Sequence, residues 1–304
     1  MTSQDRNVKQ IIQERLQEGS LPGRRSDQHL LALCIEGGGI RGSISAGMGI
    51  AIQQLNILPA FDRVYGTSVG ALNGAYLLAG QACEEYAALY RYAVLPGHLF
   101  PGNFSGRWPI DTGWLFNKAL PERAPIDWDR LWNAPQTLHP LVWQLGWREA
   151  RDGSTLITPG NSKEMSHLLR AAASPPLLSE LPLPHHQLDA GPFEPWPMYT
   201  PLRDGCSHLV ILRTCVQEEA GTHQSVWGAW GERISKAGGE FNRRAGGGKY
   251  ADHEKALQSM IGPSLRAVRP SQQWVQTLDR DAARIDRAVR ESQKDFRRWW
   301  KSRS

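Results

Sequence analysis

The chain has 304 residues, 40% of them hydrophobic, and a formal net charge of +5. No run approaches the about 18 apolar residues of a membrane-spanning helix, and the charged start MTSQDRNVKQIIQERL lacks the apolar segment of a signal peptide. The four cysteines have neither metal-binding nor redox spacing, and nothing indicates nucleic-acid binding. We therefore expect a cytoplasmic protein that needs no metal ion or other cofactor.

Patterns of helix and strand alternate along the chain after a helical extension over residues 1–29. Strands are expected over 30–36, 63–65, 141–145, 209–213 and 265–268, and helices over 44–55, 71–79, 82–92, 163–173 and 252–260, followed by a long C-terminal helix. Such alternation predicts an α/β fold with a mainly parallel sheet flanked by helices. Sites in these sheets lie at the carboxyl ends of the strands.

A run of glycines, GGGIRG (37–42), follows the first strand directly. Glycines let backbone N–H groups point outward, as stabilisation of an oxyanion requires. The run also fits the dinucleotide fingerprint, which needs an acidic residue at the end of the second strand. Asp62 is the nearest candidate, but it opens that strand instead of closing it. No Gly-Lys-Ser/Thr follows, which excludes a Walker phosphate loop.

The second strand runs into GTSVG (66–70), which leads into a helical stretch. A serine on a strand-to-helix turn between glycines is typical of the nucleophile elbow of serine hydrolases. Side chains at Gly66 and Gly70 would collide with the neighbouring strand and helix, and the hydroxyl of Ser68 would be exposed. Taken alone, the pattern also fits a Gly/Ser turn without chemistry.

A third motif, HHQLDAGPFEPWP (185–197), places Asp189 after a short extended stretch and before a Pro-rich loop. An aspartate in such a turn commonly forms only an Asx-turn.

The three blocks GGGIRG, GTSVG and DAG, in this order and at these separations, resemble those of the bacterial patatin-like phospholipases. The resemblance covers the chain from about residue 30 to 270, and it implies a three-layer α/β fold and a phospholipid or other lipid ester as substrate. It further implies a catalytic dyad of Ser68 and Asp189, with Asp189 as general base. The implied oxyanion hole and motif glycines are Gly37, Gly38, Gly39, Arg41, Gly42, Gly66, Gly70 and Gly191. Arg41 would add positive field or brace the loop, or it would be a structural salt-bridge partner.

Two positions depart from the family pattern. Ala190 stands where glycine is usual, and a positive φ there would cost about 1 kcal/mol or more. Val69, beside the nucleophile, is larger than the small residue that the family often has, which would narrow the acyl site. Neither change removes a reacting group.

Two other functions fit part of the pattern. A Ser-Asp-His triad of an α/β-hydrolase would use Ser68, Asp189 and one of His208, His223 and His253, but the serine comes early for that fold, after only one strand. A catalytically silent patatin-like protein could serve as a membrane or partner adaptor. The intact Ser68, Asp189 and glycine block argue against it.

Two further segments, residues 95–138 and 271–304, contain distinctive patterns of aromatic or apolar residues. Residues 95–138 hold four tryptophans, Trp108, Trp114, Trp128 and Trp132, and could form a lid, a wall for the acyl chain or ordinary core. In residues 271–304, apolar residues recur at helical spacing, namely Trp274, Leu278, Ala282, Ile285, Val289, Phe296 and Trp299. From Arg290 onward, the sequence has six basic residues and two acidic ones. Together with the apolar pattern, this positive charge predicts either that residues 271–304 make peripheral contact with an anionic membrane or that they form a helix packed on the body of the protein.

Overall fold

The computed structural model describes residues 7–100, 109–144, 146–176, 178–180, 187–216 and 248–302. The α-helices in these ranges are α1 (Val8–Glu18), α2 (Gly42–Gln54), α3 (Val69–Leu78), α4 (Glu84–Ala93), α5 (Thr112–Trp114), α6 (Leu120–Arg123), α7 (Trp128–Asn133), α8 (Ser162–Ala172), α9 (Tyr199–Arg203), α12 (Gly248–Met260) and α13 (Ala282–Lys301). The strands are β1 (Leu31–Ile35), β2 (Arg63–Thr67), β3 (Thr137–Gln144), β4 (Arg151–Asp152), β5 (Gln187–Asp189), β6 (His208–Leu212) and β7 (Leu265–Val268). None of the helices in these ranges has a stretch of apolar residues of the length that a membrane span requires.

The strands form one sheet in the order β4-β3-β2-β1-β6-β7, with β5 paired to β3. The pairs of β1 with β2 and β6, of β2 with β3, and of β6 with β7 are parallel. Among the described strands, the short β4 and β5 alone run antiparallel to their neighbour, β3. The sheet is therefore mainly parallel, as the alternation of elements predicted. The short extended stretch expected before Asp189 is β5, whereas the sequence patterns missed β4.

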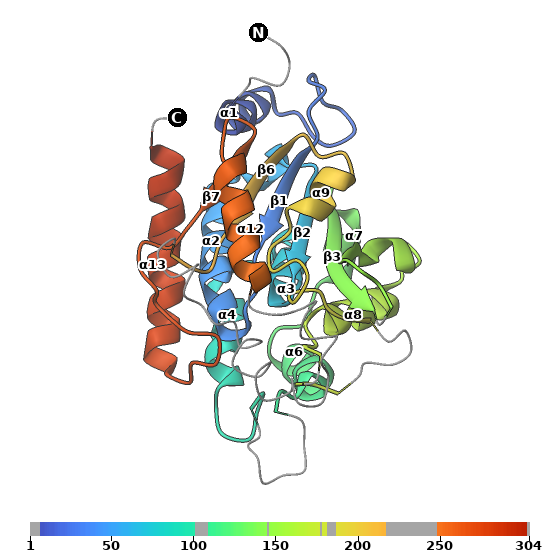
Figure 1. Cartoon of the computed structure of the whole chain (residues 1–304), viewed down its shortest axis with the longest axis vertical. Helices are drawn as coiled ribbons and strands as arrows, with labels where there is room; N and C mark the ends of the chain where they lie inside the picture. Colours follow the sequence, from blue (N-terminus) through green and yellow to red (C-terminus); the bar gives the residue numbers. More distant parts are fainter. Residues whose placement is uncertain are drawn as a thin grey trace.

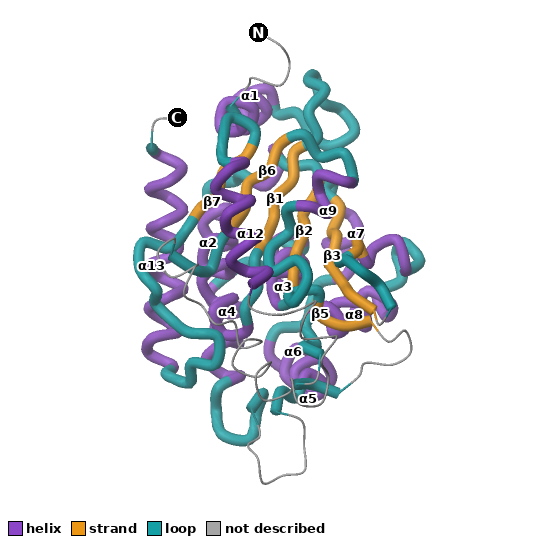
Figure 2. The backbone as a smooth tube through the Cα atoms, in the orientation of Figure 1, coloured by secondary structure: helices purple, strands orange, loops and turns teal. Residues whose placement is uncertain are grey.

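Two hydrophobic clusters cover the two faces of the sheet. In β1, Leu31, Leu33 and Ile35 point to the face covered by α2 and α3, while Ala32 and Cys34 point to the face covered by α9 and α12. Successive side chains of a strand alternate between faces, so every residue of β1 is buried. Three layers result, helices on either side of one sheet (Figure 2).

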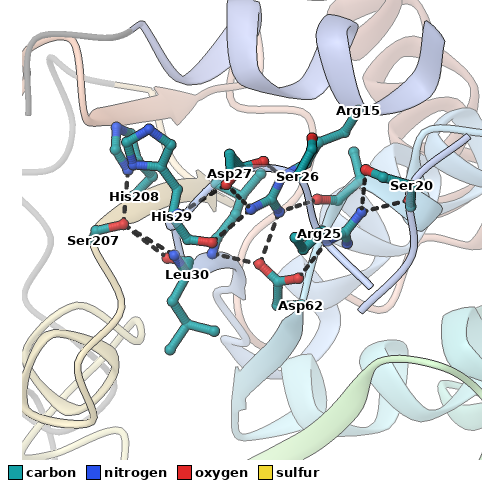
Figure 3. A network of polar contacts seen from close by, with 12 residues as sticks. Arg15, Ser20, Arg25, Ser26, Asp27, His29, Leu30, Asp62, Ser207 and His208 are labelled. Atoms are coloured by element: carbon teal, nitrogen blue, oxygen red, sulfur yellow. Dashed lines mark hydrogen bonds and ion pairs between the residues drawn. The ribbon is translucent and has the colours of Figure 1, made fainter. Parts of the chain in front are cut away.

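The amino-terminal edge of the sheet is closed by the extension that carries α1. Arg15 of α1 donates two hydrogen bonds to the carboxylate of Asp27 and one to Asp62, each at 2.8 Å. Arg25 donates to the other oxygen of Asp62 at 2.8 Å (Figure 3). These ion pairs fix the extension to the start of β2. Asp62 therefore serves this edge and lies far from the glycine run, which removes the acidic residue that the dinucleotide interpretation needed.

The C-terminal helix α13 packs along α2. A Cβ atom added to Gly47 of α2 would overlap the backbone of Val289, so glycine is required for this close approach. Ile285, Ala288 and Phe296 of α13 belong to the same core. The apolar face of the helix is thus packed on the body of the protein.

The helix is shorter than the apolar spacing predicted. It begins at Ala282, where the side chain of Asp281 caps it by accepting hydrogen bonds from the amides of Ala283 and Arg284. Trp274 and Leu278 precede it in non-helical backbone, so extending the helical pattern to them was wrong. The far end of α13 lies beside α1, because Lys9 donates hydrogen bonds to the carbonyl oxygen of Ser302 at 2.9 Å and to its hydroxyl at 2.8 Å (Figure 1).

Candidate active site

Ser68 connects β2 to α3 and has a strained backbone. Its dihedral angles are φ 57° and ψ −139°, a combination that costs a non-glycine residue about 1–3 kcal/mol and is found mostly at functional sites. A Cβ atom on Gly66 would overlap the start of α3 at Ala71, and one on Gly70 would overlap the carbonyl oxygen of Ile35 in β1. The collisions predicted for side chains at both glycines are confirmed.

The glycine run lies directly against this turn. A Cβ atom on Gly37 would be 2.6 Å from the Cβ atom of Ser68. Gly38 and Gly39 have φ values of 112° and 62°, which L side chains rarely adopt. Within the described part of the chain, neither of these two amides donates a hydrogen bond to another residue, whereas the next amide, of Ile40, donates to the carbonyl oxygen of Thr277 at 3.0 Å. A Cβ atom on Gly42 would overlap the side chain of Val69.

Asp189 ends β5 and is only 4% exposed. Burial raises the pKa of its carboxyl group to about 6, and hydrogen bonds from the Ser68 side chain and the Gly191 amide offset this only in part. The Gly191 amide donates to Oδ1 at 2.7 Å. Among the described residues, no arginine or lysine forms an ion pair with Asp189. The structure therefore brings Ser68 and Asp189 together, from turns 121 positions apart.

Ala190 does not have the positive φ that was considered at this position. The only non-glycine residues with positive φ in the described ranges are Asn56 and Ser68. Alanine is accommodated here without strain.

Arg41 is buried and turned into the body of the protein. Its Nη1 donates to the Sγ atom of Cys215 at 2.8 Å, and its Nη2 lies 4.0 Å from Oε1 of Glu36. A Cβ atom on Gly38 would be 2.8 Å from Nη2, so the guanidinium also lies against the loop. These contacts favour the bracing role over the role of a simple salt-bridge partner, although the side chain also borders the cavity.

Ser68, Asp189 and the glycine run border one cavity of about 1080 Å³ including its open mouth. Its walls are largely apolar and come from several segments: Leu99, Phe100, Ile110, Leu115, Leu178 and Leu278. Residues 95–138 therefore contribute part of the wall, whereas Trp114, Trp128 and Trp132 pack against the core. Trp108 lies outside the described residues.

None of the described residues that line the cavity is a histidine. His208 is buried at the start of β6, at the amino-terminal edge, and its ring meets that of His29 edge to face. His253 lies in α12, where its ring meets those of Trp196 and Tyr199. His223 lies outside the described residues. The described part of the structure thus places no candidate histidine of a triad beside Ser68.

The family model named patatin-like phospholipase matches residues 33–189, which is more than half of the chain. The chain belongs to the patatin-like phospholipase family. The match begins in β1 and ends at Asp189, so it includes the glycine run, the serine turn and the aspartate. It identifies the family and no particular branch of it. A search of curated proteins found no match to the chain.

Members of the patatin-like phospholipase family generally act as lipid acyl hydrolases. The apolar cavity of this chain agrees with such a substrate. Within the described residues, no group of three or more His, Cys, Asp or Glu side chains could hold a metal ion. The sequence patterns did not reveal that Glu36, Tyr250, Thr277 and Leu278 also border the cavity. Only the position of Glu36, directly before the glycine run, gave a signal.

Proposed function

We propose that this patatin-like protein hydrolyses the ester bonds of phospholipids or other lipids through an acyl-enzyme on Ser68. The observation that carries the proposal is the buried carboxylate of Asp189, which has no cationic partner among the described residues and borders the same cavity as the strained Ser68. An unpaired buried carboxylate holds a proton more strongly than one in water, as a general base for a hydroxyl must.

In the first half of the reaction, Oγ of Ser68 attacks the ester carbonyl carbon and its proton passes to Asp189. The carbon–oxygen bond to the leaving alcohol then breaks, and Asp189 returns the proton to that alcohol. In the second half, Asp189 takes a proton from water, the hydroxide attacks the acyl-serine, and the proton returns to Ser68 as the fatty acid leaves.

The amides of Gly38 and Gly39 would stabilise the oxyanion in both halves. Three observations support this role: their unusual φ values, their lack of acceptors among the described residues, and their place beside Ser68 on the wall of one cavity. Losing one such donor costs on the order of 3 kcal/mol of transition-state stabilisation. Arg41, placed against the same loop, would add positive field and hold the loop in shape.

We also propose that the protein is cytoplasmic and makes peripheral contact with anionic membranes through α13. Five exposed cations recur along the outward face of this helix at spacings of three and four residues: Arg287, Arg290, Lys294, Arg298 and Lys301. Cations near an anionic surface contribute about 1 kcal/mol each. The final turn, with Trp299 and Trp300, packs beside α1, so the contact would depend on the cations more than on these rings.

The test combines a panel of phospholipids and esters of increasing chain length with covalent labelling by a fluorophosphonate. We expect hydrolysis in the wild type, preference for chains long enough to fill the apolar cavity, and a single label on Ser68. A well-folded Ser68→Ala protein that keeps full esterase activity would refute the proposal. Labelling at Ser68 without turnover on any ester would favour the silent adaptor.

A further inference from the structure

A second buried charge cluster lies beneath the glycine run, beginning with Glu36. This residue follows β1 directly and is 1% exposed. Its Oε2 accepts hydrogen bonds at 2.7 Å from Nε of Arg213 and from the amide of Thr214, and its Oε1 accepts one at 2.9 Å from the hydroxyl of Tyr250. Burial alone would raise the pKa of Glu36, but the charges of Arg213 and Arg41 outweigh burial and lower it. The carboxylate is therefore ionised at neutral pH.

Arg213 is the centre of this cluster. It follows β6, is completely buried and donates from Nη1 to Oε2 of Glu254 in α12 at 2.8 Å. Its guanidinium carbon lies 3.4 Å from the centre of the Trp196 ring. Contacts with Glu36 after β1, with Glu254 of α12 and with the Trp196 ring thus fix the guanidinium in one place.

The segment that starts at Arg213 also contacts the glycine run itself. The Thr214 hydroxyl donates to the carbonyl oxygen of Gly37 at 3.0 Å. The thiol of Cys215 accepts the hydrogen bond from Arg41, whose guanidinium lies against Gly38. Residues 213–215 therefore support the loop at its first residue and at its arginine.

The cluster contains more positive than negative charge. Arg41, Arg213 and Arg269 face two carboxylates, Glu36 and Glu254, which leaves an excess of one positive charge. In a buried, low-dielectric site this excess favours negative charge developing nearby. The reacting oxygen would be such a charge.

We propose that Arg213 is a positioning residue for the oxyanion hole: paired with Glu36 and Glu254, it holds the glycine run so that the amides of Gly38 and Gly39 face the reacting carbonyl. The inference rests on the proposed function of these amides. It adds two residues that lie outside the three sequence blocks, Glu36 and Arg213, which are 177 positions apart in the chain. Its action is on transition-state charge, so it affects kcat more than KM.

The chain offers a matched control for this proposal. Arg15 is also buried, also binds two carboxylates, and lies at the opposite edge of the sheet. Lysine keeps the charge but cannot reproduce the planar fork of arginine. The experiment compares Arg213→Lys with Arg15→Lys by kcat and KM on a soluble short-chain ester, per folded protein as measured by near-UV circular dichroism.

We expect Arg213→Lys to lower kcat about tenfold or more while KM changes less than about threefold. Arg15→Lys should lower the melting temperature and leave kcat within about twofold of the wild type. A folded Arg213→Lys protein with wild-type kcat would overturn the proposal, and so would equal losses of kcat in the two variants.

If Arg213→Lys fails to fold, a second variant tests whether residues 213–215 position the glycine run. Thr214→Val keeps every charge and removes the hydrogen bond to the Gly37 carbonyl. It should lower kcat several-fold, on the order of the one hydrogen bond lost, with KM unchanged. Unchanged kcat in Thr214→Val would count against the proposal by itself.

Different results would refute the proposed hydrolase function and the positioning role of Arg213. If Ser68→Ala retains activity, or if the wild type hydrolyses no ester, the proposed function fails. If activity depends on Ser68 and both Arg213→Lys and Thr214→Val behave as the wild type, only the positioning role fails.

Discussion

Two aspartates at opposite edges of the sheet have opposite pKa shifts. At the amino-terminal edge, Arg15 donates two hydrogen bonds to Asp27, and these bonds, opposed by partial burial, lower the pKa of Asp27 to about 2. At the carboxyl-terminal edge, burial raises the pKa of Asp189 to about 6. The same side chain is thus a fixed anion at one edge and a proton acceptor at the other. The difference depends on whether a guanidinium accompanies it.

We expect the largest loss of activity from substitutions of the two proposed catalytic residues. Ser68→Ala and Asp189→Asn should each lower kcat/KM by about a thousandfold or more, and the double variant should be scarcely worse, because the two groups act as one unit. Asp27→Asn should leave kcat within about twofold of the wild type. Steady-state kinetics on a soluble ester measure all four proteins. Additive losses in the double variant would show that the two residues act separately.

The glycine run offers the next largest effect. Gly39→Ala should lower kcat about a hundredfold, since its amide would turn away from the oxyanion or move with the loop. Gly19→Ala is the control at the opposite edge, because Gly19 has nearly the same φ, 64°, against 62° for Gly39, and open space around its Cβ position. It should cost stability only. Similar kcat in the two variants would exclude a special role for Gly39.

Ionisation of the two aspartates should change the stability of the folded state in opposite directions. The pKa of Asp189 is raised from 3.8, so ionisation between pH 3.8 and about 6 destabilises the folded state. Asp189→Asn should therefore stabilise the protein at pH 8 by up to about 3 kcal/mol, and not at pH 3.8. The pKa of Asp27 is lowered, so its contribution is present above pH 3.8 and is lost as the pH falls towards 2. Urea unfolding of both Asn variants at several pH values checks the signs; destabilisation by Asp189→Asn at pH 8 would contradict the assigned cause.

The activity should follow the same ionisation. Because the base must be unprotonated, kcat/KM should rise about tenfold per pH unit below a midpoint near pH 6 and level off above it. A pH-rate profile on an uncharged ester measures the midpoint. A midpoint near pH 4, the range of an ordinary carboxylate, would mean that Asp189 is not desolvated in the free enzyme.

The smallest effect concerns α13, which runs along the flank between the two edges. Reversing two exposed cations with Arg290→Glu and Lys294→Glu should weaken sedimentation with anionic liposomes, about 1 kcal/mol for each cation lost, and more at low salt. Hydrolysis of a soluble ester should not change. Deleting residues from Phe296 onward is a poorer test, because Phe296 is buried in the core. Liposome binding that is unchanged by both charge-reversing substitutions would show that the cations are only solvated.

The sequence by itself determined the alternation of helices and strands, and it singled out Ser68, Asp189 and the glycines around them. These signals are local: periodicity reports which side chains face the core, and a turn that needs glycine shows it in a few consecutive residues. The start of α13 was less well determined, because apolar residues at helical spacing, such as Trp274 and Leu278, can be buried or border a cavity without being helical.

Only the tertiary structure decided which charges meet. Nothing local marks Asp27 as the partner of Arg15, or Arg213 as the partner of Glu36, because each pair joins separate elements of the fold. The pKa of a carboxylate depends on burial and on neighbours within a few ångströms, which the chain brings together only on folding. The sequence therefore named the residues of the candidate site, and the packing of the sheet determined which aspartate is paired with an arginine and which is left to accept a proton.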